Sequence, residues 1–393
     1  MKIIFFAEFI ADGFGGTEAV ARDLANHFSI YNDVAIGYID RPINNHFKYN
    51  NNIQHIILTE DKKLFLNHIL AFDPDVFVLF GYSRNILNYI KLLHGHGIPI
   101  VCHEGAFPER VISKNWMNDD INRANALWER DLAYSDAFKI RFIFDEYRNS
   151  LSSFNYFKSI SFLNPLRLYK IVEPEHKKNI IINIGGCKPN KNIFPLLKAF
   201  RNVITTYPDW ELHIYSKQQK QSKYYKEIIS FLTYNNLLKS VILHKPTVLI
   251  HEKYDESAFH VITSESESLS LAVAESMCHG IPSIGFAHCP GVNRLIKNEK
   301  NGILVKGGDN EIENLEKAIT LLIKNKDLRL KLGHQAFDDA SSFNPEKIYN
   351  MWEHIFDEAL QYKKTNLLTE KHLQNDREVA LHYLRIKQNI FNS

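Results

Sequence analysis

The stretch over residues 263–276, T-S-E-S-E-S-L-S-L-A-V-A-E-S, gathers three glutamates and five serines around the start of an expected buried helix over 270–279. Glu267 falls in the loop before this helix, and Glu275 falls about one turn into it. Each carboxylate can accept paired hydrogen bonds from the vicinal hydroxyls of a ribose or a hexose. Compensation of the positive charge at the helix N-terminus is an alternative explanation for Glu265 and Glu267, and we interpret Glu265 as surface charge. This alternative explains Glu275 poorly, because Glu275 lies inside a largely apolar helix. The stretch therefore predicts a sugar-binding site.

Two glycine-rich turns are candidates for binding a phosphate. The run G-G-C-K-P-N-K-N over 185–192 follows an expected strand and brings two lysines to the start of a helix, where backbone N–H groups also bind anions. The run F-G-G-T-E over 14–18 holds the equivalent place in the first half of the chain. Neither run matches a P-loop or the dinucleotide fingerprint. Structural alternatives stay open for both. The run over 185–192 can be a solvated loop, and the run over 14–18 can be a tight turn with Thr17 as helix N-cap.

A histidine follows directly after the expected strand over 98–103. His103-Glu104-Gly105 lies at the carboxyl end of that strand, where a histidine can act as a base or bind a sugar hydroxyl. A purely structural histidine is the usual alternative. Two other patterns, D-P-D over 73–75 and H-G-H over 94–96, are rejected as metal sites because the first precedes a strand and the second has no third ligand nearby.

Short apolar runs alternate with helical periodicity along the chain, which indicates parallel βα units. We expect an N-terminal domain over 1–165, a linker over 166–178, a C-terminal domain over 179–344, and C-terminal helices over 345–393. The first of these helices is expected to cross back to the N-terminal domain. Strands are expected over 2–9, 33–40, 53–58, 75–81, 98–103, 137–144, 157–163, 179–184, 210–215, 240–244, 258–263 and 281–286. Two doubly wound domains of this kind would bind a ligand at the carboxyl ends of their sheets, in the cleft between them.

Composition excludes several classes of protein. The 393 residues carry a net charge of +2, with 16 − 19 = −3 over residues 1–165 and 31 − 26 = +5 over the remainder, so we expect no nucleic acid partner. The four cysteines have no C-x-x-C spacing, which argues against zinc and disulfides and fits a reducing cytoplasm. No apolar run reaches the roughly 18 residues of a membrane span. We therefore expect a cytoplasmic protein, and we leave open peripheral contact with the inner face of the plasma membrane.

Taken together, the motifs resemble those of the retaining glycosyltransferases of family 4, which have the GT-B fold. The resemblance rests on Glu267 and Glu275 as an E-x7-E pair, the following S-M-C-H-G-I-P, the runs C-P-G-V-N-R-L-I over 289–296 and N-G-I-L-V over 301–305, and the G-G-T-E at the front. It extends to about residue 361. It implies a hexosyltransferase that needs neither a metal nor a cofactor and uses a nucleotide sugar, expected to be UDP-linked. The acceptor would be a glycan or lipid-linked molecule in the synthesis of surface polysaccharide or lipopolysaccharide.

The resemblance also implies roles for individual residues. Glu267 would bind the hydroxyls of the donor sugar, Glu275 the ribose, and Lys191 the diphosphate. His103 would lie at the reacting sugar, which makes His103, Glu267 and Lys191 the expected catalytic residues. The remaining expected donor-binding residues are Gly15, Gly16, Gly186, Lys188, Ser268, Leu269, Ser270 and Leu271, and the expected acceptor-binding residues are His103, Glu104, Thr17 and Glu18.

Three departures from the family pattern concern the donor. Gly186 stands where the family usually has an arginine, and Lys188 is our candidate for supplying the lost charge. Ser268 and Ser270, either of which is also a candidate N-cap, replace two usual glycines, and Tyr215-Ser216-Lys217 replaces a usual G-x-G. The alternatives are a non-catalytic GT-B subunit or scaffold of another transferase, and a sugar-nucleotide epimerase. An NAD dehydrogenase is disfavoured because the first βα turn lacks its fingerprint.

Overall fold

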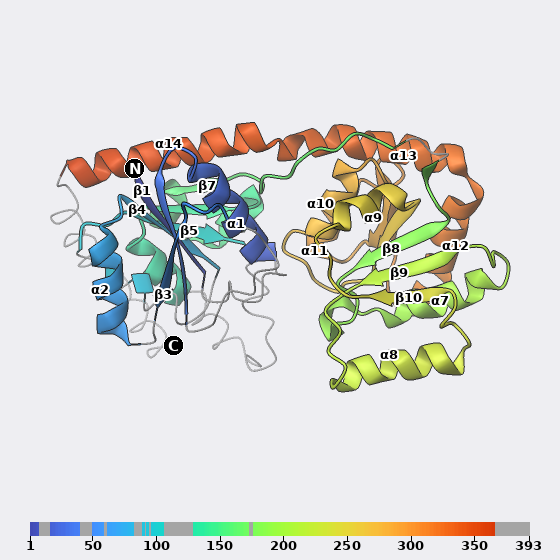
Figure 1. Ribbon diagram of the computed structural model, residues 1–393. Coiled ribbons are helices and arrows are strands. Elements are labelled where there is room, and N and C mark those ends of the chain that lie inside the picture. The colour runs from blue at the N-terminus through green and yellow to red at the C-terminus, as the bar shows by residue number, and fades with distance from the viewer. Residues whose placement is uncertain are drawn as a thin grey trace, which may run out of the picture. The chain divides into compact units, whose positions relative to one another are not determined.

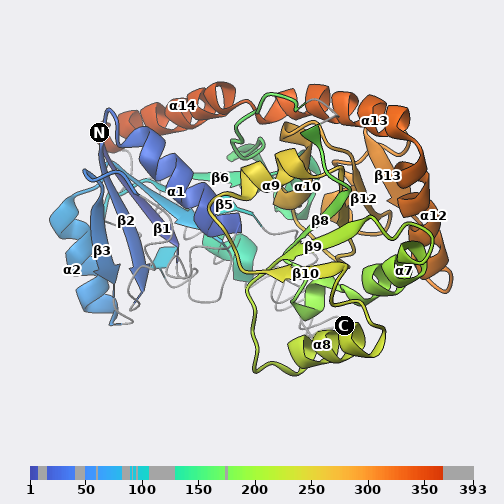
Figure 2. The same ribbon diagram turned by 45° about the vertical axis from the view of Figure 1, so that its right-hand side comes forward.

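The computed structural model describes residues 1–7, 16–39, 49–58, 61–81, 89–90, 92–93, 96–105, 129–172 and 176–365 (Figures 1 and 2). The chain forms two compact units. Unit 1 comprises Met1–Pro165 and Glu346–Ser393, and unit 2 comprises Leu166–Pro345.

Unit 1 is built on a parallel sheet with the strand order β3-β2-β1-β4-β5-β6-β7. Successive strands are added on one side of β1 up to β3 and on its other side from β4 onward. This order is that of a Rossmann-like domain. The strands are β1 (Lys2–Ala7), β2 (Asp33–Ile39), β3 (Gln54–Leu58), β4 (Val76–Phe80), β5 (Ile100–Glu104), β6 (Lys139–Phe142) and β7 (Ser159–Ser161). The described helices are α1 (Gly16–Phe28), α2 (Lys62–Phe72), η2 (Asp145–Ser150), α6 (Ser153–Phe157) and α14 (Pro345–Lys364).

Both faces of the unit 1 sheet are buried, because β4 is apolar at every position and β1 is apolar at every position after Lys2. In β1, Ile3 and Phe5 face one core, which also receives α1 and α14, whereas Ile4 and Phe6 face a second core that includes residues of α2. The long helix α14, drawn in red in Figure 1, presents Ile348, Trp352, Ile355, Phe356 and Ala359 to the first core.

Unit 2 repeats the architecture with a parallel sheet in the order β10-β9-β8-β11-β12-β13. Its strands are β8 (Ile180–Ile184), β9 (Glu211–Tyr215), β10 (Val241–His244), β11 (Phe259–Ile262), β12 (Ser283–Phe286) and β13 (Gly302–Val305). Its helices are η4 (Pro189–Lys191), α7 (Phe194–Ile204), α8 (Lys223–Tyr234), α9 (Ile250–Glu256), α10 (Leu271–Cys278), α11 (Pro290–Asn293), α12 (Glu311–Lys324), α13 (Lys326–Asp339) and η5 (Ala340–Phe343).

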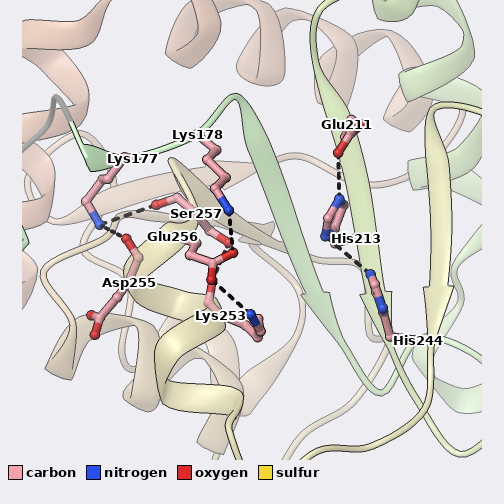
Figure 3. Close-up of polar contacts among 9 residues, drawn as sticks. All are labelled: Lys177, Lys178, Glu211, His213, His244, Lys253, Asp255, Glu256 and Ser257. Carbon is pink, nitrogen blue, oxygen red and sulfur yellow. Dashed lines mark hydrogen bonds and ion pairs between the residues drawn. The ribbon is translucent and has the colours of Figure 1, made fainter.

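The segment over 166–178, which we predicted as a linker, is part of unit 2 because its described residues bond to that unit (Figure 3). The Nζ of Lys177 donates hydrogen bonds to the backbone oxygens of Asp255 and Ser257, each at 3.3 Å. Lys178 forms an ion pair of 3.0 Å with Glu256. The last two residues of this segment, Lys177 and Lys178, thus contact the end of α9.

Some elements of unit 2 were not predicted from the sequence. The strand β13 and the helices α9 and α11 were missed because four to seven residues carry too little periodicity to identify an element. The sequence also predicts helices over 84–95 and 119–134, and both ranges lie largely outside the described residues. Within the part of the chain that is described, no helix is long and apolar enough to cross a membrane.

The packing of α14 predicts a localised effect on stability. Trp352 is fully buried and contacts the rings of Phe162 and Phe356, so Trp352→Ala should lower the free energy of unfolding of unit 1 by about 3–5 kcal/mol. Hydrogen–deuterium exchange of β1 and β4 measures this loss. The neighbouring Met351→Ala is the matched control, because Met351 is 41% exposed and its truncation should cost less than about 1 kcal/mol. Equal effects of the two substitutions would contradict the packing described here.

Candidate functional site

The candidate site of unit 2 is built on two adjacent parallel strands, β8 and β11. The strand order runs outward from this pair in opposite directions, which makes their carboxyl ends the switch point where open α/β sheets bind ligands. The loop over 185–193 follows β8 and the loop over 263–270 follows β11. Because the strands are parallel neighbours, both loops emerge at the same edge of the sheet.

An ion pair joins these two loops. The Nζ of Lys191, the last residue of η4, contacts Oε1 of Glu267. The side chains are 24% and 10% exposed, so the pair is partly shielded from water but still reachable from solvent. The hydroxyl of Thr263 donates to the backbone oxygen of Lys191 at 3.3 Å, which is a second link between the loops. Two of the expected catalytic residues are thus in direct contact.

Two glycines allow the loops to pack this closely. A Cβ at Gly291, in α11, would lie 2.5 Å from the backbone oxygen of Glu267, so α11 supports the backbone of that residue directly. A Cβ at Gly186 would lie 2.4 Å from Oδ1 of Asn183 and 2.6 Å from Cδ1 of Ile193. Position 186, where the resemblance leads one to expect an arginine, therefore has no room for a side chain unless Asn183 and Ile193 move.

Lys188 lies in the same loop and is exposed. It is the N-cap residue of η4 and its side chain has no hydrogen bond or ion pair among the residues that the structure describes. Its backbone oxygen accepts a 2.9 Å hydrogen bond from the N–H of Lys191, so the two lysines lie on one turn of chain. The arrangement brings two cationic side chains to the loop that lacks an arginine.

The residues over 268–271 form the entry to α10. Ser268, Leu269 and Ser270 are buried, and Leu271 is partly buried. Of the two predicted N-cap candidates, Ser270 occupies the N-cap position, but its side chain accepts no hydrogen bond from the first turn of the helix. The N–H groups of that turn are therefore not used by the Ser270 hydroxyl.

Glu275 lies in the second turn of α10 and has a different partner from Glu267. The hydroxyl of Tyr254, in α9, lies 3.1 Å from Oε2 of Glu275 and 3.0 Å from the backbone oxygen of Ala272. Burial, followed by the charge of Glu275, raises the pKa of Tyr254 well above its ordinary value, so the phenol keeps its proton and donates it. Tyr254 thereby orients the second carboxylate, a role that no pattern in the sequence indicates.

Glu265, which we interpret as surface charge, is exposed and also connects three loops. Its Oε1 accepts a hydrogen bond from Nδ2 of Asn192, and its Oε2 lies 3.0 Å from Nε2 of His288. His288 follows β12 at the same edge of the sheet. The contacts of Asn192 and His288 with Glu265 were not predicted from the sequence. The only available signal was the position of these two residues just after a turn or a strand at that edge.

In unit 1, His103 is only 2% exposed and lies against a buried arginine. The Nη1 of Arg141, in β6, lies 3.0 Å from Nδ1 of His103 and donates a 2.9 Å hydrogen bond to Oδ1 of Asn164. Its Nη2 donates to the backbone oxygen of Phe162. Burial and then the charge of Arg141 lower the pKa of His103 well below its ordinary value. His103 is therefore a neutral imidazole that accepts from Arg141 at Nδ1 and carries its proton at Nε2.

Glu104, the next residue of β5, points into the core of unit 1. Its Oε2 accepts from the hydroxyl of Tyr134 and lies 3.3 Å from Nε of Arg130, and all three side chains are buried. The predicted role of Glu104 in acceptor binding stays a prediction, and the described contacts are those of a buried ion pair.

The front turn of unit 1 is described in part. The helix α1 begins at Gly16, so Thr17 lies inside its first turn and is not the N-cap. Glu18 is also in this turn, where the helix dipole favours a carboxylate. Gly15 lies outside the described residues.

Comparison of sequences identifies proteins that are similar to part of the chain. Residues 168–339 match the family model "Glycosyl transferases group 1". An uncharacterized glycosyltransferase of Haemophilus influenzae is 30% identical over 199 residues, which is 50% of this chain and 54% of that protein. The amylovoran biosynthesis glycosyltransferase AmsD of Erwinia amylovora is 25% identical over 179 residues, covering 46% of this chain and 48% of that protein. The matches thus span about half the length of these relatives.

Comparison of structures extends the similarity to both units. The crystal structure of Anabaena Alr3699/HepE in complex with UDP has a TM-score of 0.74 and 15% sequence identity, and the match covers 91% of this chain and all of that one. At this identity the likeness shows the fold alone. The chain has the GT-B fold with two Rossmann-like α/β domains, which confirms the predicted fold class.

The burial of His103 predicts a pH dependence of stability. An unfolded histidine gains a proton below pH ~6.5, whereas folded His103 stays neutral, so the unfolded state binds more protons as the pH falls. His103 should therefore reduce the unfolding free energy by up to about 1.4 kcal/mol for each pH unit below ~6.5. Denaturation of the wild type and His103→Gln at pH 7.5 and pH 5 measures this: the wild type should lose more stability than the variant. His354→Gln, at a 74% exposed position, is the control. An equal loss in wild type and His103→Gln would contradict a neutral His103.

Proposed function

We propose that the protein is a retaining glycosyltransferase. It transfers a hexose from a UDP-linked sugar to a glycan or lipid-linked acceptor in the synthesis of a cell-surface polysaccharide, without a metal ion or other cofactor. The observation that carries the proposal is the Lys191–Glu267 ion pair, which joins the loops at the switch point of a unit whose residues 168–339 match a glycosyltransferase family model.

The ion pair suits a sugar diphosphate because it offers both kinds of contact at one point. The ammonium of Lys191 has three donors, so it can keep its contact with Glu267 and still donate to a phosphate oxygen. The carboxylate of Glu267 can accept hydrogen bonds from sugar hydroxyls beside that phosphate. Lys188 and the first turn of α10 add positive charge and N–H donors for the remaining phosphate oxygens.

Glu275 is assigned to the ribose of the nucleotide. A carboxylate has about four lone-pair sites, so Glu275 can accept from Tyr254 and also from vicinal ribose hydroxyls. The separate supports of Glu267 and Glu275, α11 for the first and Tyr254 for the second, fit two separate duties toward sugar and ribose.

The proposed reaction occurs on one face of the donor sugar. The bond between the anomeric carbon and the phosphate oxygen breaks, and its electron pair stays on the diphosphate. The acceptor oxygen forms the new bond to the anomeric carbon on the same face, and its proton passes to the departing phosphate oxygen. Lys191, Lys188 and the N-terminus of α10 stabilise the charge that develops on the diphosphate. His103, as a neutral donor at Nε2, is assigned a hydrogen bond to the reacting sugar.

The comparisons support the choice of donor and pathway. The Anabaena structure contains UDP, and the Erwinia relative is named for the biosynthesis of amylovoran. A cytoplasmic location, with contact to the inner face of the plasma membrane, would give the enzyme access to nucleotide sugars and to a lipid-linked acceptor.

Release of UDP tests the proposed activity. The full chain is incubated with UDP-glucose, UDP-galactose or UDP-N-acetylglucosamine, and we expect UDP release from at least one of them. Lys191→Ala should lower the rate by about 10²–10³-fold, because it removes the cation nearest the leaving group. Glu275→Ala should raise the Michaelis constant for the donor, while Glu313→Ala, at a 60% exposed position in α12, should match the wild type.

Two outcomes would reject the proposal. Failure of every nucleotide sugar to bind in the millimolar range or tighter would exclude a transferase of this kind. Donor binding without UDP release, whatever the acceptor, would favour the non-catalytic subunit.

Lys188 has a separate test. If it replaces the missing arginine charge, Lys188→Ala should weaken UDP binding by roughly two- to fivefold, in line with the value of one exposed charge pair. Titration calorimetry measures the affinity, and Lys300→Ala is the control because Lys300 is also exposed and lies in the turn before β13. Unchanged affinity and rate in Lys188→Ala would show that this lysine does not replace the arginine.

A further inference from the structure

A groove lies between α7 and α8 on unit 2, and the site described above does not use it. Its volume is about 770 Å³, and Phe194 and Lys198 of α7 face Lys223, Lys226, Ser230 and Phe231 of α8 across it. This volume is within the range of about 300–1,000 Å³ that small-molecule sites occupy. The groove is open to solvent, which suits a chain that passes through it better than an enclosed ligand.

The lining of the groove is basic on balance, with Lys198, Lys223 and Lys226 against Glu227, which lies 3.8 Å from Lys223. The segment that forms the groove is basic as well. Residues 188–245 contain 10 lysines and arginines against 3 acidic residues, a net +7, whereas the whole chain is +2 and its other residues therefore sum to −5. Lysines recur at every third position over 217–226, and those at 217, 220, 223 and 226 are all exposed. Of the three acidic residues, only Glu227 lines the groove, since the other two lie at the amino end of β9. The charge of the groove thus favours an anionic occupant.

Aromatic rings accompany these lysines. Phe194 is packed edge-on against Phe231 and Tyr224, with ring centroids 6.0 and 5.4 Å away, and all three rings are half-buried. Rings held in this way provide apolar surface between the cationic side chains. Sugar units carry apolar C–H faces as well as hydroxyls, so a glycan with acidic groups matches both features.

One residue that lines the groove, Phe194, comes directly after the loop of the candidate donor site. Phe194 is the third residue after Lys191, and the hydroxyl of Tyr224 accepts a 3.0 Å hydrogen bond from the N–H of Ile193. This bond ties the start of α8 to the loop that contains Lys188 and Lys191. A chain lying in the groove would therefore run alongside the loop to which we assign the diphosphate.

We propose that the α7–α8 groove binds an acidic glycan chain, the polymer to which the enzyme adds sugars. The inference rests on the proposed function, because it names the class of acceptor. An anionic bilayer is the less suitable partner, since peripheral membrane surfaces project apolar side chains into the lipid, whereas Phe194 and Phe231 are half-buried in the floor of a groove.

Binding of polygalacturonate, a uronate polymer, tests the proposal on the full chain. Titration calorimetry at low salt should detect binding that weakens as salt is added, because exposed charges are screened. The double variant Lys198→Gln/Lys226→Gln should bind roughly five- to tenfold more weakly. Lys300→Gln/Lys324→Gln is the matched control, since it removes the same charge from exposed positions outside the groove and should bind as the wild type does.

Three further measurements separate this proposal from its alternatives. Dextran, a neutral glycan, should bind far more weakly than polygalacturonate. UDP affinity should be the same in the wild type and in Lys198→Gln/Lys226→Gln, so a failure of donor binding counts against the proposed function and not against the groove. Three outcomes would each overturn the proposal. The first is no binding of polygalacturonate, and the second is an equal loss of polygalacturonate affinity in the control variant. The third is that Lys198 and Lys226 matter only for binding to phosphatidylglycerol vesicles.

Discussion

The ion pair between Lys191 and Glu267 depends on the order of strands in the unit 2 sheet. The two residues are 76 positions apart in the chain and meet because β8 and β11 are parallel neighbours whose loops leave the sheet at one edge. Gly291 lets α11 reach the backbone of Glu267, and Thr263 holds the backbone of Lys191. The geometry of the site is thus set by the sheet and by close backbone packing, and flexible side chains contribute little to it.

Unit 1 is organised around a buried cation. Arg141 is fully buried, and among the described residues its guanidinium has hydrogen-bond partners that are all neutral: the amide of Asn164, the backbone oxygen of Phe162 and the imidazole of His103. Burial lowers the pKa of Arg141 to about 9, so the arginine remains charged at neutral pH. The aromatic face of Phe162, 4.4 Å from the guanidinium carbon, adds a cation–π contact. Burial of His103, followed by the charge of Arg141, lowers the pKa of His103 and keeps it neutral.

Periodicity and turn chemistry were enough to predict most of the fold. Buried parallel strands are nearly continuous apolar runs, so β1, β4, β8 and β11 were recognised within one or two residues of their ends, although β1, β8 and β11 each contain one polar residue. The site was harder, because sequence patterns identify residue types and not their partners. Nothing in the sequence distinguishes Tyr254 from an ordinary core tyrosine, and Glu265 looked like surface charge because its partners, Asn192 and His288, belong to other loops.

The crowding at Gly186 has a consequence for how this loop can change. Any side chain at position 186 meets both Asn183 and Ile193, so a substitution there requires those two side chains to move or to become smaller. Substitutions at three such contacting positions are not additive in their effects on stability. A library that varies position 186 alone therefore favours glycine and other small residues. One that varies 183, 186 and 193 together can reach a loop with an arginine, and the order in which changes accumulate decides which loop a lineage can acquire.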